Sequence, residues 1–155
     1  NNKQRDRNSS IKISFNSVSR KNNKNVDSMH FQTTNKKSYI YNGFLLKDFT
    51  TFDIDTYNKN GTSNKKPLIR FFPKLGFEVQ YPIIDYSNKS SFLIEPKIQL
   101  LISPDDYFNT KIRNEDSLEL DLTSSNLFNH DRYSGNDRKE GGTRINYGIL
   151  LKKIN

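Results

Sequence analysis

Apolar and polar residues alternate with a period of two through much of this chain, most clearly between positions 69 and 81. The apolar parity there holds Ile69, Phe71, Leu75, Phe77, Val79 and Tyr81. The other parity holds Arg70, Lys74, Gly76, Glu78 and Gln80, and only Phe72 and Pro73 depart from the pattern. A slip of one residue would exchange the two faces, so the register is well specified. The stretch predicts a strand with one apolar face.

Four further stretches show the same period. They cover positions 11–15, 38–54, 92–102 and 145–151, and their apolar parities include Ile94, Ile98, Leu100, Ile145, Tyr147 and Ile149. The 38–54 stretch is apolar on both parities, which suggests a hidden bulge. Pro96 lies within the 92–102 stretch, where its missing N–H predicts a bulge or weak point. Positions 20–38 look like a polar linker, and 57–66, with Asn60 and Gly61, look like a turn.

About five antiparallel strands are compatible with a membrane barrel segment, and three of the stretches are long enough to cross a membrane. A tilted transmembrane strand needs only about 9 to 11 residues, and no stretch reaches the roughly 18 apolar residues of a membrane-spanning helix. Hydrophobic residues make up 32% of the chain, below the usual 45 to 50% or so. A barrel tolerates this because only its outward face must be apolar. The same low value is equally typical of a partly disordered chain. We interpret residues 1–155 as a partial, all-β membrane barrel domain, internal to a longer protein.

The connections predict an orientation. The turn at 85–90 is short and the link at 103–142 is long, and outer-membrane barrels have short periplasmic turns and long external loops. Residues 103–142 are thus predicted to be an extracellular surface loop. Tyr81, Tyr86 and Phe92 would then lie near the periplasmic interface.

The residues of the long link predict an ordered loop. It opens with acidic residues, and Asp131-Arg132 and Asp137-Arg138 flank Tyr133-Ser134-Gly135. These pairs can satisfy each other locally. Gly135 and the doublet Gly141-Gly142 are residues for which positive φ costs little. The alternative is a solvated charged connection without a further role.

These motifs closely resemble the C-terminal signature of the outer-membrane lipopolysaccharide-assembly family LptD, in its alphaproteobacterial form. The matching elements are Asn114 to Ser117, Asn126 to Phe128, Arg132 to Arg138, Glu140 to Arg144 and Asn146 to Gly148. The resemblance covers roughly residues 67–151. The chain has no cysteine, so the disulfides that many members carry are not expected here.

The resemblance implies a non-enzymatic translocon in the outer membrane of a Gram-negative bacterium, without cofactor or metal. Its implied partners are lipopolysaccharide, membrane lipids, a plug lipoprotein inside the barrel and a periplasmic bridge of lipopolysaccharide-carrying proteins. It assigns a structural or gating role to a set of loop residues, namely Asn114, Asp116, Arg132, Tyr133, Ser134, Gly135, Asp137, Arg138, Gly141, Gly142 and Arg144. The apolar parities listed above would face lipid.

Other functions receive less support. The net charge of +8 is spread over polar connections, which does not favour nucleic-acid binding. Glu115 with Glu119, Asp116 with Asp121, or His130 with Asp131 lack a nucleophile at a recognisable spacing. Asp131, Asn136 and Asp137 lack the spacing of a dedicated calcium loop. His30 is isolated and is expected to be structural.

Two other architectures stay open. One is a different outer-membrane barrel, a porin or receptor, which a loop folded into the lumen would favour. The other is a soluble β-sandwich that binds carbohydrate, in which the apolar residues of the 69–81 strand would be buried against a second sheet.

Overall fold

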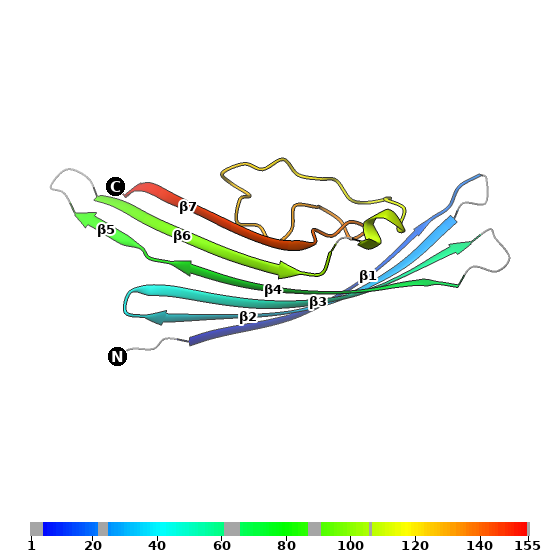
Figure 1. Cartoon of the computed structure of the whole chain (residues 1–155), viewed down its shortest axis with the longest axis horizontal. Coiled ribbons are helices and arrows are strands. Elements are labelled where there is room, and N and C mark those ends of the chain that lie inside the picture. Colours follow the sequence, from blue (N-terminus) through cyan, green and yellow to red (C-terminus); the bar gives the residue numbers. More distant parts are fainter. Residues whose placement is uncertain (1–4, 22–24, 61–65, 87–90, 106, 155) are drawn as a thin grey trace.

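The computed structural model describes residues 5–21, 25–60, 66–86, 91–105 and 107–154. These residues form one curved antiparallel sheet (Figure 1). The elements are β1 (Arg5–Val18), β2 (Asn25–Tyr41), β3 (Phe44–Asn60), β4 (Leu68–Gln80), β5 (Ile83–Tyr86), β6 (Ser91–Ser103), the 3₁₀ helix η1 (Tyr107–Thr110) and β7 (Gly142–Ile154). The prediction of an all-β antiparallel sheet is confirmed, with seven strands in place of about five among the described residues.

Each strand pairs with the next one along the chain, except where β6 pairs with β4, β5 and β7. Strands β4 and β5 are collinear, because Gln80 pairs with Lys97 and Ile83 pairs with Ile94 in one continuous register. Between them, the Tyr81 N–H donates to the Pro96 carbonyl at 3.1 Å. No bulge occurs at Pro96, since the β6–β7 register passes through the Pro96–Ile149 pair without a shift. The weak point predicted as the alternative is present on the other side of β6, where the ladder ends at Gln80–Lys97 and resumes only at Ile83–Ile94.

The β2–β3 hairpin is the main feature that the sequence pattern missed. Asn42 and Gly43 both have positive φ, 49° and 82°, as a two-residue type I′ turn requires. Strands β2 and β3 extend over 17 residues each, so positions 25–38 are strand and not linker. Position 60 still belongs to β3, and 61–65 lie outside the described residues. No bulge occurs in β3, whose register with both neighbours is unbroken.

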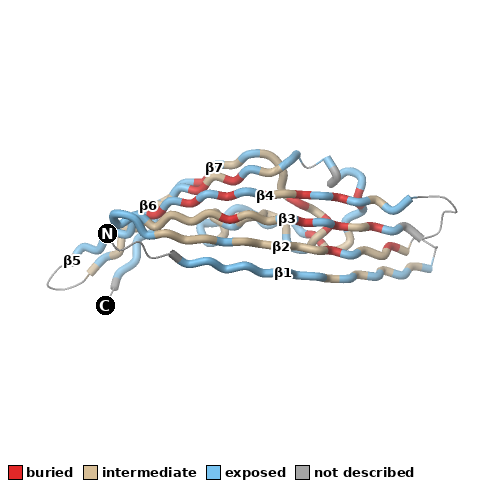
Figure 2. Tube along the Cα trace, turned by 90° about the horizontal axis from the view of Figure 1, so that it is seen from below, coloured by how far each residue is buried: buried red, intermediate tan, exposed pale blue. Residues whose placement is uncertain are grey.

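Burial alternates along β4 without interruption (Figure 2). Arg70, Phe72, Lys74, Glu78 and Gln80 are buried on the concave face. Phe72 therefore does not break the pattern, because it supplies an apolar residue to the inner face. The outer residues Ile69, Phe71, Leu75, Phe77, Val79, Tyr81, Ile98, Ile145, Tyr147 and Ile149 are exposed, and Ile94 and Leu100 are half-buried. No second sheet covers them in the described part of the chain, contrary to the sandwich alternative.

The exposed apolar band runs obliquely across the strands. On β1 the band is centred on Ile13. The strand pairing, followed through Phe31 and Ile54, places Ile13 level with position 71 of β4. On β7 the band is centred on Tyr147, which the pairing through Ile98 places level with position 79 of β4. Eight residues along a strand are roughly 26 Å, and five strand-to-strand steps are roughly 24 Å. The band is thus inclined by roughly 45° to the strands, as expected when barrel strands cross a membrane with tilt.

Residues 107–141 cover the part of the concave face that lies away from the Asn42–Gly43 turn (Figure 1). They leave β6 and enter β7 at the end of the sheet opposite the Asn42–Gly43 turn. The segment folds back over the inner side of the sheet, however, and does not extend away as a surface loop. We call it the inner loop. Its Ile112 forms a small core with Val26, Tyr57 and Leu68.

The short-turn end of the sheet carries aromatic residues. Tyr81 packs against Phe44 with ring centroids 4.6 Å apart, and Phe92 is exposed near the start of β6. The side chain of Tyr86 lies outside the described residues. Among the residues described, no helix has the length and apolar character needed to cross a membrane.

Candidate functional site

Two aspartates tie the start of the inner loop to its end. The Asp116 carboxylate accepts the N–H groups of Asn136 and Asp137, each at 3.0 Å. The Asp137 carboxylate accepts the N–H groups of Glu115 at 2.7 Å and Asp116 at 3.1 Å. The two acidic residues therefore hold two chain segments together by satisfying backbone donors that would otherwise be buried without partners. We call this arrangement the aspartate knot.

Neighbouring side chains complete the knot. Asn114 and Ser117 form a local turn, because the Asn114 carboxamide donates to the Ser117 carbonyl at 2.7 Å and accepts its N–H at 2.9 Å. The Ser117 hydroxyl accepts the Arg138 N–H at 3.0 Å. Ser134 N–H donates to the Leu118 carbonyl at 3.0 Å, next to a β-bridge between Glu119 and Tyr133. The two matched motifs, which are distant in sequence, thus form one unit.

Gly135 is required at the centre of the knot. Its φ is +81°, and a Cβ there would lie 2.4 Å from the Asp116 carbonyl oxygen. Gly142 also has a positive φ, +89°, but a Cβ there would have no neighbour within 4 Å. Gly141 is not among the residues with positive φ. Both backbone strain and lack of space therefore select glycine at position 135, and strain alone does so at position 142.

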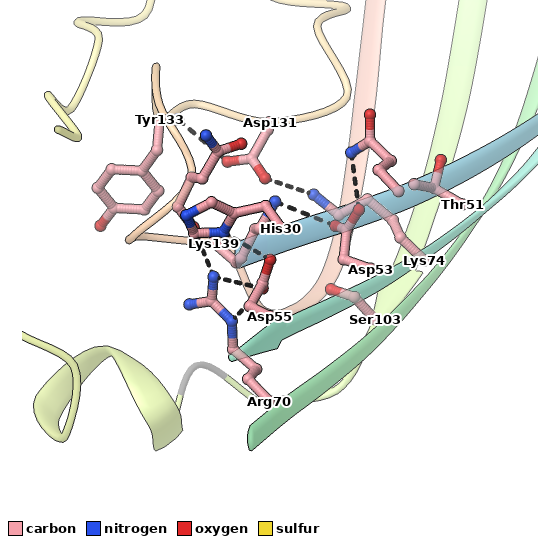
Figure 3. A network of polar contacts seen from close by, with 12 residues as sticks. His30, Thr51, Asp53, Asp55, Arg70, Lys74, Ser103, Asp131, Tyr133 and Lys139 are labelled. Atoms are coloured by element: carbon pink, nitrogen blue, oxygen red, sulfur yellow. Dashed lines mark hydrogen bonds and ion pairs between the residues drawn. The ribbon is translucent and has the colours of Figure 1, made fainter. Parts of the chain in front are cut away.

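Arg70 fastens the knot to the sheet (Figure 3). Its side chain is fully buried on β4. The guanidinium donates to the Asp55 carboxylate at 2.7 Å, to the Asp137 carbonyl at 2.7 Å and to the Asn136 carbonyl. His30 holds the other oxygen of Asp55 at 2.8 Å and packs edge-on against Tyr57. His30 is therefore structural, as expected, and three strands contribute to one attachment point.

Two lysines make further buried connections between sheet and loop. Lys74 donates to the Asp131 carboxylate and to the His130 carbonyl, both at 2.8 Å. Lys139 of the loop pairs with Asp53 of β3 at 3.1 Å. Both lysines are buried, so these charges are satisfied mainly by each other and not by water. Both pairs lie on the same side of the Arg70 attachment point, because Asp53 is in register with Phe72 and Lys74 lies two residues farther along β4 (Figure 3).

Glu140 joins the end of the loop to β7. Its carboxylate accepts from Arg132 at 2.9 Å and from Arg144 at 2.6 Å, and Arg144 also donates to the Asn129 carbonyl. Two signature arginines thus share one carboxylate. The other signature arginine, Arg138, donates to the Ile112 carbonyl at 3.0 Å.

An aromatic stack makes the contact between the middle of the loop and the sheet. The rings of His130 and Phe49 are parallel, with centroids 3.6 Å apart. Phe49 lies across Gly76, its register partner on β4; a Cβ at position 76 would lie only 1.9 Å from the Phe49 ring. Gly76 therefore gives Phe49 the space in which it supports His130.

The pKa values of two loop carboxylates and of the loop imidazole are shifted by their surroundings. Burial opposes ionisation of Asp116, but the N–H groups of Asp137 and Asn136 hold its pKa below the usual value. Burial and the adjacent Asp116 raise the pKa of Asp137. Burial, together with Lys36, Lys74 and Lys97, lowers the pKa of His130 to about 4. At neutral pH His130 is thus uncharged, in an electropositive environment.

The structure brings all the predicted loop residues into this assembly, but not with the partners expected. The pairs Asp131-Arg132 and Asp137-Arg138 do not satisfy each other: Asp131 binds Lys74, Arg132 binds Glu140, and Asp137 binds backbone N–H groups. The strand residues that receive the loop were missed as site residues, namely His30, Phe49, Asp53, Asp55, Arg70 and Lys74. Their signal was available, because polar residues on one strand parity mark an inner face that needs partners.

Nothing in the described residues forms a metal site of three or more histidine, cysteine, aspartate or glutamate side chains. Asp131 and Asp137, two of the residues weighed for calcium, are occupied by the lysine and by backbone N–H donors.

A family model described as "LptD: LPS transport system D" matches residues 2–150. No significant match was found among curated proteins. The match extends over the first strands as well as the signature. An inner loop had been the expected mark of a porin or receptor; in this chain it occurs together with the signature, so it does not discriminate. The chain therefore belongs to the LptD family, the non-enzymatic lipopolysaccharide translocon barrels of the Gram-negative outer membrane.

Proposed function

We propose that this segment supplies part of the translocon wall together with a fixed inner loop that narrows the lumen. In a closed barrel the concave face is the lumenal face. The inner loop then occupies lumen space, and lipopolysaccharide passes beside it. The observation that carries this proposal is the bonding of the fully buried Arg70 to two loop carbonyls.

The energetics favour a fixed loop over a moving gate. Releasing the loop would keep the ion pair between Arg70 and Asp55, because both residues belong to the sheet. It would break the hydrogen bond from Arg70 to the Asp137 carbonyl and the ion pair between Lys74 and Asp131. Removing one partner of a buried ion pair typically costs about 3–5 kcal/mol, because the other charge is left uncompensated. Release of the loop costs less for each pair, since both charges regain water. Several such contacts would have to break together. The role assigned to Asn114, Asp116, Gly135, Asp137 and Arg138 is to keep the loop folded, and that assigned to Arg132 and Arg144 is to join it to β7 through Glu140.

We assign the outer face to lipid contact. The exposed band comprises Ile69, Phe71, Leu75, Phe77, Val79, Tyr81, Ile94, Ile98, Leu100, Ile145, Tyr147 and Ile149. Its inclination of roughly 45° to the strands supports this assignment. A band that is parallel to the membrane plane crosses tilted barrel strands at such an angle.

The proposed partners are lipopolysaccharide, a lipoprotein plug in the lumen and the periplasmic protein bridge. A partner within the lumen is supported by apolar residues at the short-turn end of the concave face. Ile40 and Ile84 have the inward parity of their strands, yet they are exposed. Apolar residues in such a position need a covering partner.

Covalent fixation of the loop tests whether it must move. In the full-length translocon we would replace Lys74 and Asp131 by cysteines, because the Lys74 Nζ and Asp131 Oδ2 atoms are 2.8 Å apart. The two cysteines would then be joined with a short, reducible bifunctional thiol reagent. A fixed loop predicts that the linked protein still delivers lipopolysaccharide to the cell surface at close to the unlinked rate.

Each single-cysteine variant treated with the same reagent is the control for chemical modification. Loss of surface lipopolysaccharide only in the linked double variant, with recovery after reduction, would show that the loop is a moving gate and would disprove the fixed-loop proposal.

A further inference from the structure

A cavity of about 430 Å³ lies between the concave face and the inner loop. Its floor consists of inward-facing residues of β1 to β4 and β6, and Phe128 and His130 of the loop complete its wall. Its inward-facing charged residues are Lys36, Lys47, Lys97, Asp6 and Glu78, and Phe49 and His130 supply rings. Lys37 and Asp48, which have the outward parity of their strands, also border it.

Three inward-facing lysines, Lys36, Lys47 and Lys97, face two inward-facing carboxylates, Asp6 and Glu78, in the cavity. Glu78 accepts hydrogen bonds from Lys47 at 3.2 Å and Gln80 at 2.9 Å on one oxygen. Its other oxygen accepts from Gln99 at 3.1 Å and forms an ion pair with Lys97 at 3.0 Å. Its acceptor capacity is therefore full. Each ammonium has three donors, so Lys47 and Lys97 retain N–H groups for another acceptor.

Lys36 adds a third cation with no ion pair among the described residues. It is exposed on β2 and lines the cavity. The pKa of His130 is lowered chiefly by burial and further by Lys36, Lys74 and Lys97, whereas Glu78 raises it. The contributions of the lysines agree with a positive field at this wall of the cavity. An incoming anion would meet unsatisfied donors in partly desolvated surroundings, where charge-assisted hydrogen bonds are strong.

Aromatic surfaces lie beside these cations. The Lys97 ammonium stands 4.3 Å from the centroid of the Phe128 ring, and the His130 ring is stacked on Phe49 at the cavity wall. A flat apolar surface next to a cationic floor suits a ligand that has both a ring with C–H groups and an anionic substituent. Such a ligand uses both kinds of surface, whereas a free inorganic anion uses only one.

We propose that this cavity binds a phosphate- or carboxylate-bearing sugar of the translocated glycolipid, with Lys36, Lys47 and Lys97 contacting the anionic group and the loop aromatics contacting the ring. The inference rests on the proposed fixed loop, because Phe128 and His130 form part of the wall. It adds a defined contact point inside the lumen at which an anionic sugar is held during passage.

The test is a binding measurement on the purified full-length translocon in detergent. Saturation-transfer NMR would compare glucosamine 6-phosphate, glucosamine and inorganic phosphate as probes. We expect the phosphorylated sugar to bind at least about tenfold more tightly than either of the other two. Lys36→Ala should weaken its binding at least about fivefold. Lys12→Ala is the matched control, because Lys12 is an exposed inward-facing lysine on β1 outside the cavity.

Equal binding of inorganic phosphate and the phosphorylated sugar would overturn the sugar assignment. Absence of phosphorylated-sugar binding, or equal effects of the two lysine substitutions, would overturn the site altogether. Lys36 makes no hydrogen bond or ion pair to the loop among the described residues, so protease protection of the loop in Lys36→Ala reports on the fixed-loop proposal separately. Lost binding with a protected loop supports the cavity assignment, and retained binding contradicts it.

Discussion

The guanidinium of Arg70 donates to the backbone carbonyl of Asp137 at 2.7 Å, across 67 positions of sequence. One side chain on the sheet thereby recognises the backbone of a loop whose own side chains hold it in shape. The aspartate knot presents the Asn136 and Asp137 carbonyls, and Arg70 receives them only if the knot is folded. Loop folding and attachment to the wall are thus coupled through one buried residue.

Replacing Arg70 by alanine should release the inner loop. The change removes the donors to both loop carbonyls and leaves Asp55 without its guanidinium partner, a loss of about 3–5 kcal/mol for a buried pair. In the full-length protein we expect trypsin to cleave at Arg132, Arg138 or Lys139, sites that the folded loop protects. Lys12→Ala, an inward-facing change distant from the loop, should leave protection intact. A protected loop in Arg70→Ala would show that the other contacts suffice.

Alanine at the two positive-φ glycines should separate lack of space from backbone strain. Gly135→Ala incurs both, because the new Cβ would meet the Asp116 carbonyl oxygen at 2.4 Å, whereas Gly142→Ala incurs only the strain. We expect Gly142→Ala to cost about 1 kcal/mol or somewhat more. Gly135→Ala should cost clearly more and open the aspartate knot. Hydrogen exchange of the amides at positions 115, 116, 136 and 137 measures this, and equal exchange in the two variants would refute the steric argument.

The pattern of the sequence was sufficient to predict the faces of the strands but not the course of the loop. The alternation around Phe77 and Glu78 is a local property, and the structure keeps it through every register pair of β4. The destination of residues 104–141 depends on which inward-facing groups lack partners after the sheet has curved. Arg70, Asp55 and Lys74 have such groups, and their convergence is a property of three strands together. The rule that long loops of outer-membrane barrels are extracellular says nothing about whether such a loop folds back over the sheet.

The prediction that neighbouring charged residues in the loop pair with each other was wrong for a related reason. Asp131-Arg132 and Asp137-Arg138 are adjacent in sequence, so mutual pairing needed no knowledge of the fold. In the structure each aspartate instead binds more distant donors, which the folded loop places in better geometry. The β2–β3 turn, by contrast, was available from sequence, since Asn42-Gly43 between apolar residues is a strong hairpin signal.

The Gly76–Phe49 contact should be revealed by a double substitution. Gly76→Ala alone would place a Cβ 1.9 Å from the Phe49 ring and displace the ring from His130, at a cost of about 1–3 kcal/mol for overpacking. Phe49→Ala in the same protein removes the clash. The second substitution should therefore be less destabilising in the Gly76→Ala background than in the wild type. Heat-modifiable mobility of the folded protein gives the thermal midpoints, and additive effects would show that the two residues are not coupled.

Acidification should loosen the loop around His130. The pKa of this imidazole is about 4 in the folded protein, below its ordinary value of 6.5. The unfolded state therefore binds the proton more readily, so the stabilisation is complete above pH 6.5 and is lost as the pH falls toward 4. Asp137 acts in the opposite direction, because its pKa is raised. Hydrogen exchange at positions 127–131, corrected for intrinsic rates, should increase between pH 6.5 and 4.5. The variant His130→Gln should abolish this increase, and an unchanged pH dependence would assign it to other groups.

Adjacent positions on β7 provide a test of the lipid-facing assignment with matched side chains. Ile149 and Leu150 are both apolar and both exposed, at 68% and 53%, but they point to opposite faces of the sheet. Ile149→Arg would place a charge in the exposed band, where lipid contact near the membrane centre costs about 2–4 kcal/mol. Leu150→Arg would place it on the concave, wet side. We expect only Ile149→Arg to reduce the amount of folded protein in the outer membrane, measured by heat-modifiable mobility of the membrane fraction. Equal loss in both variants would mean that the two faces do not differ in solvent, and the division into lipid-facing and lumenal residues would have to be given up.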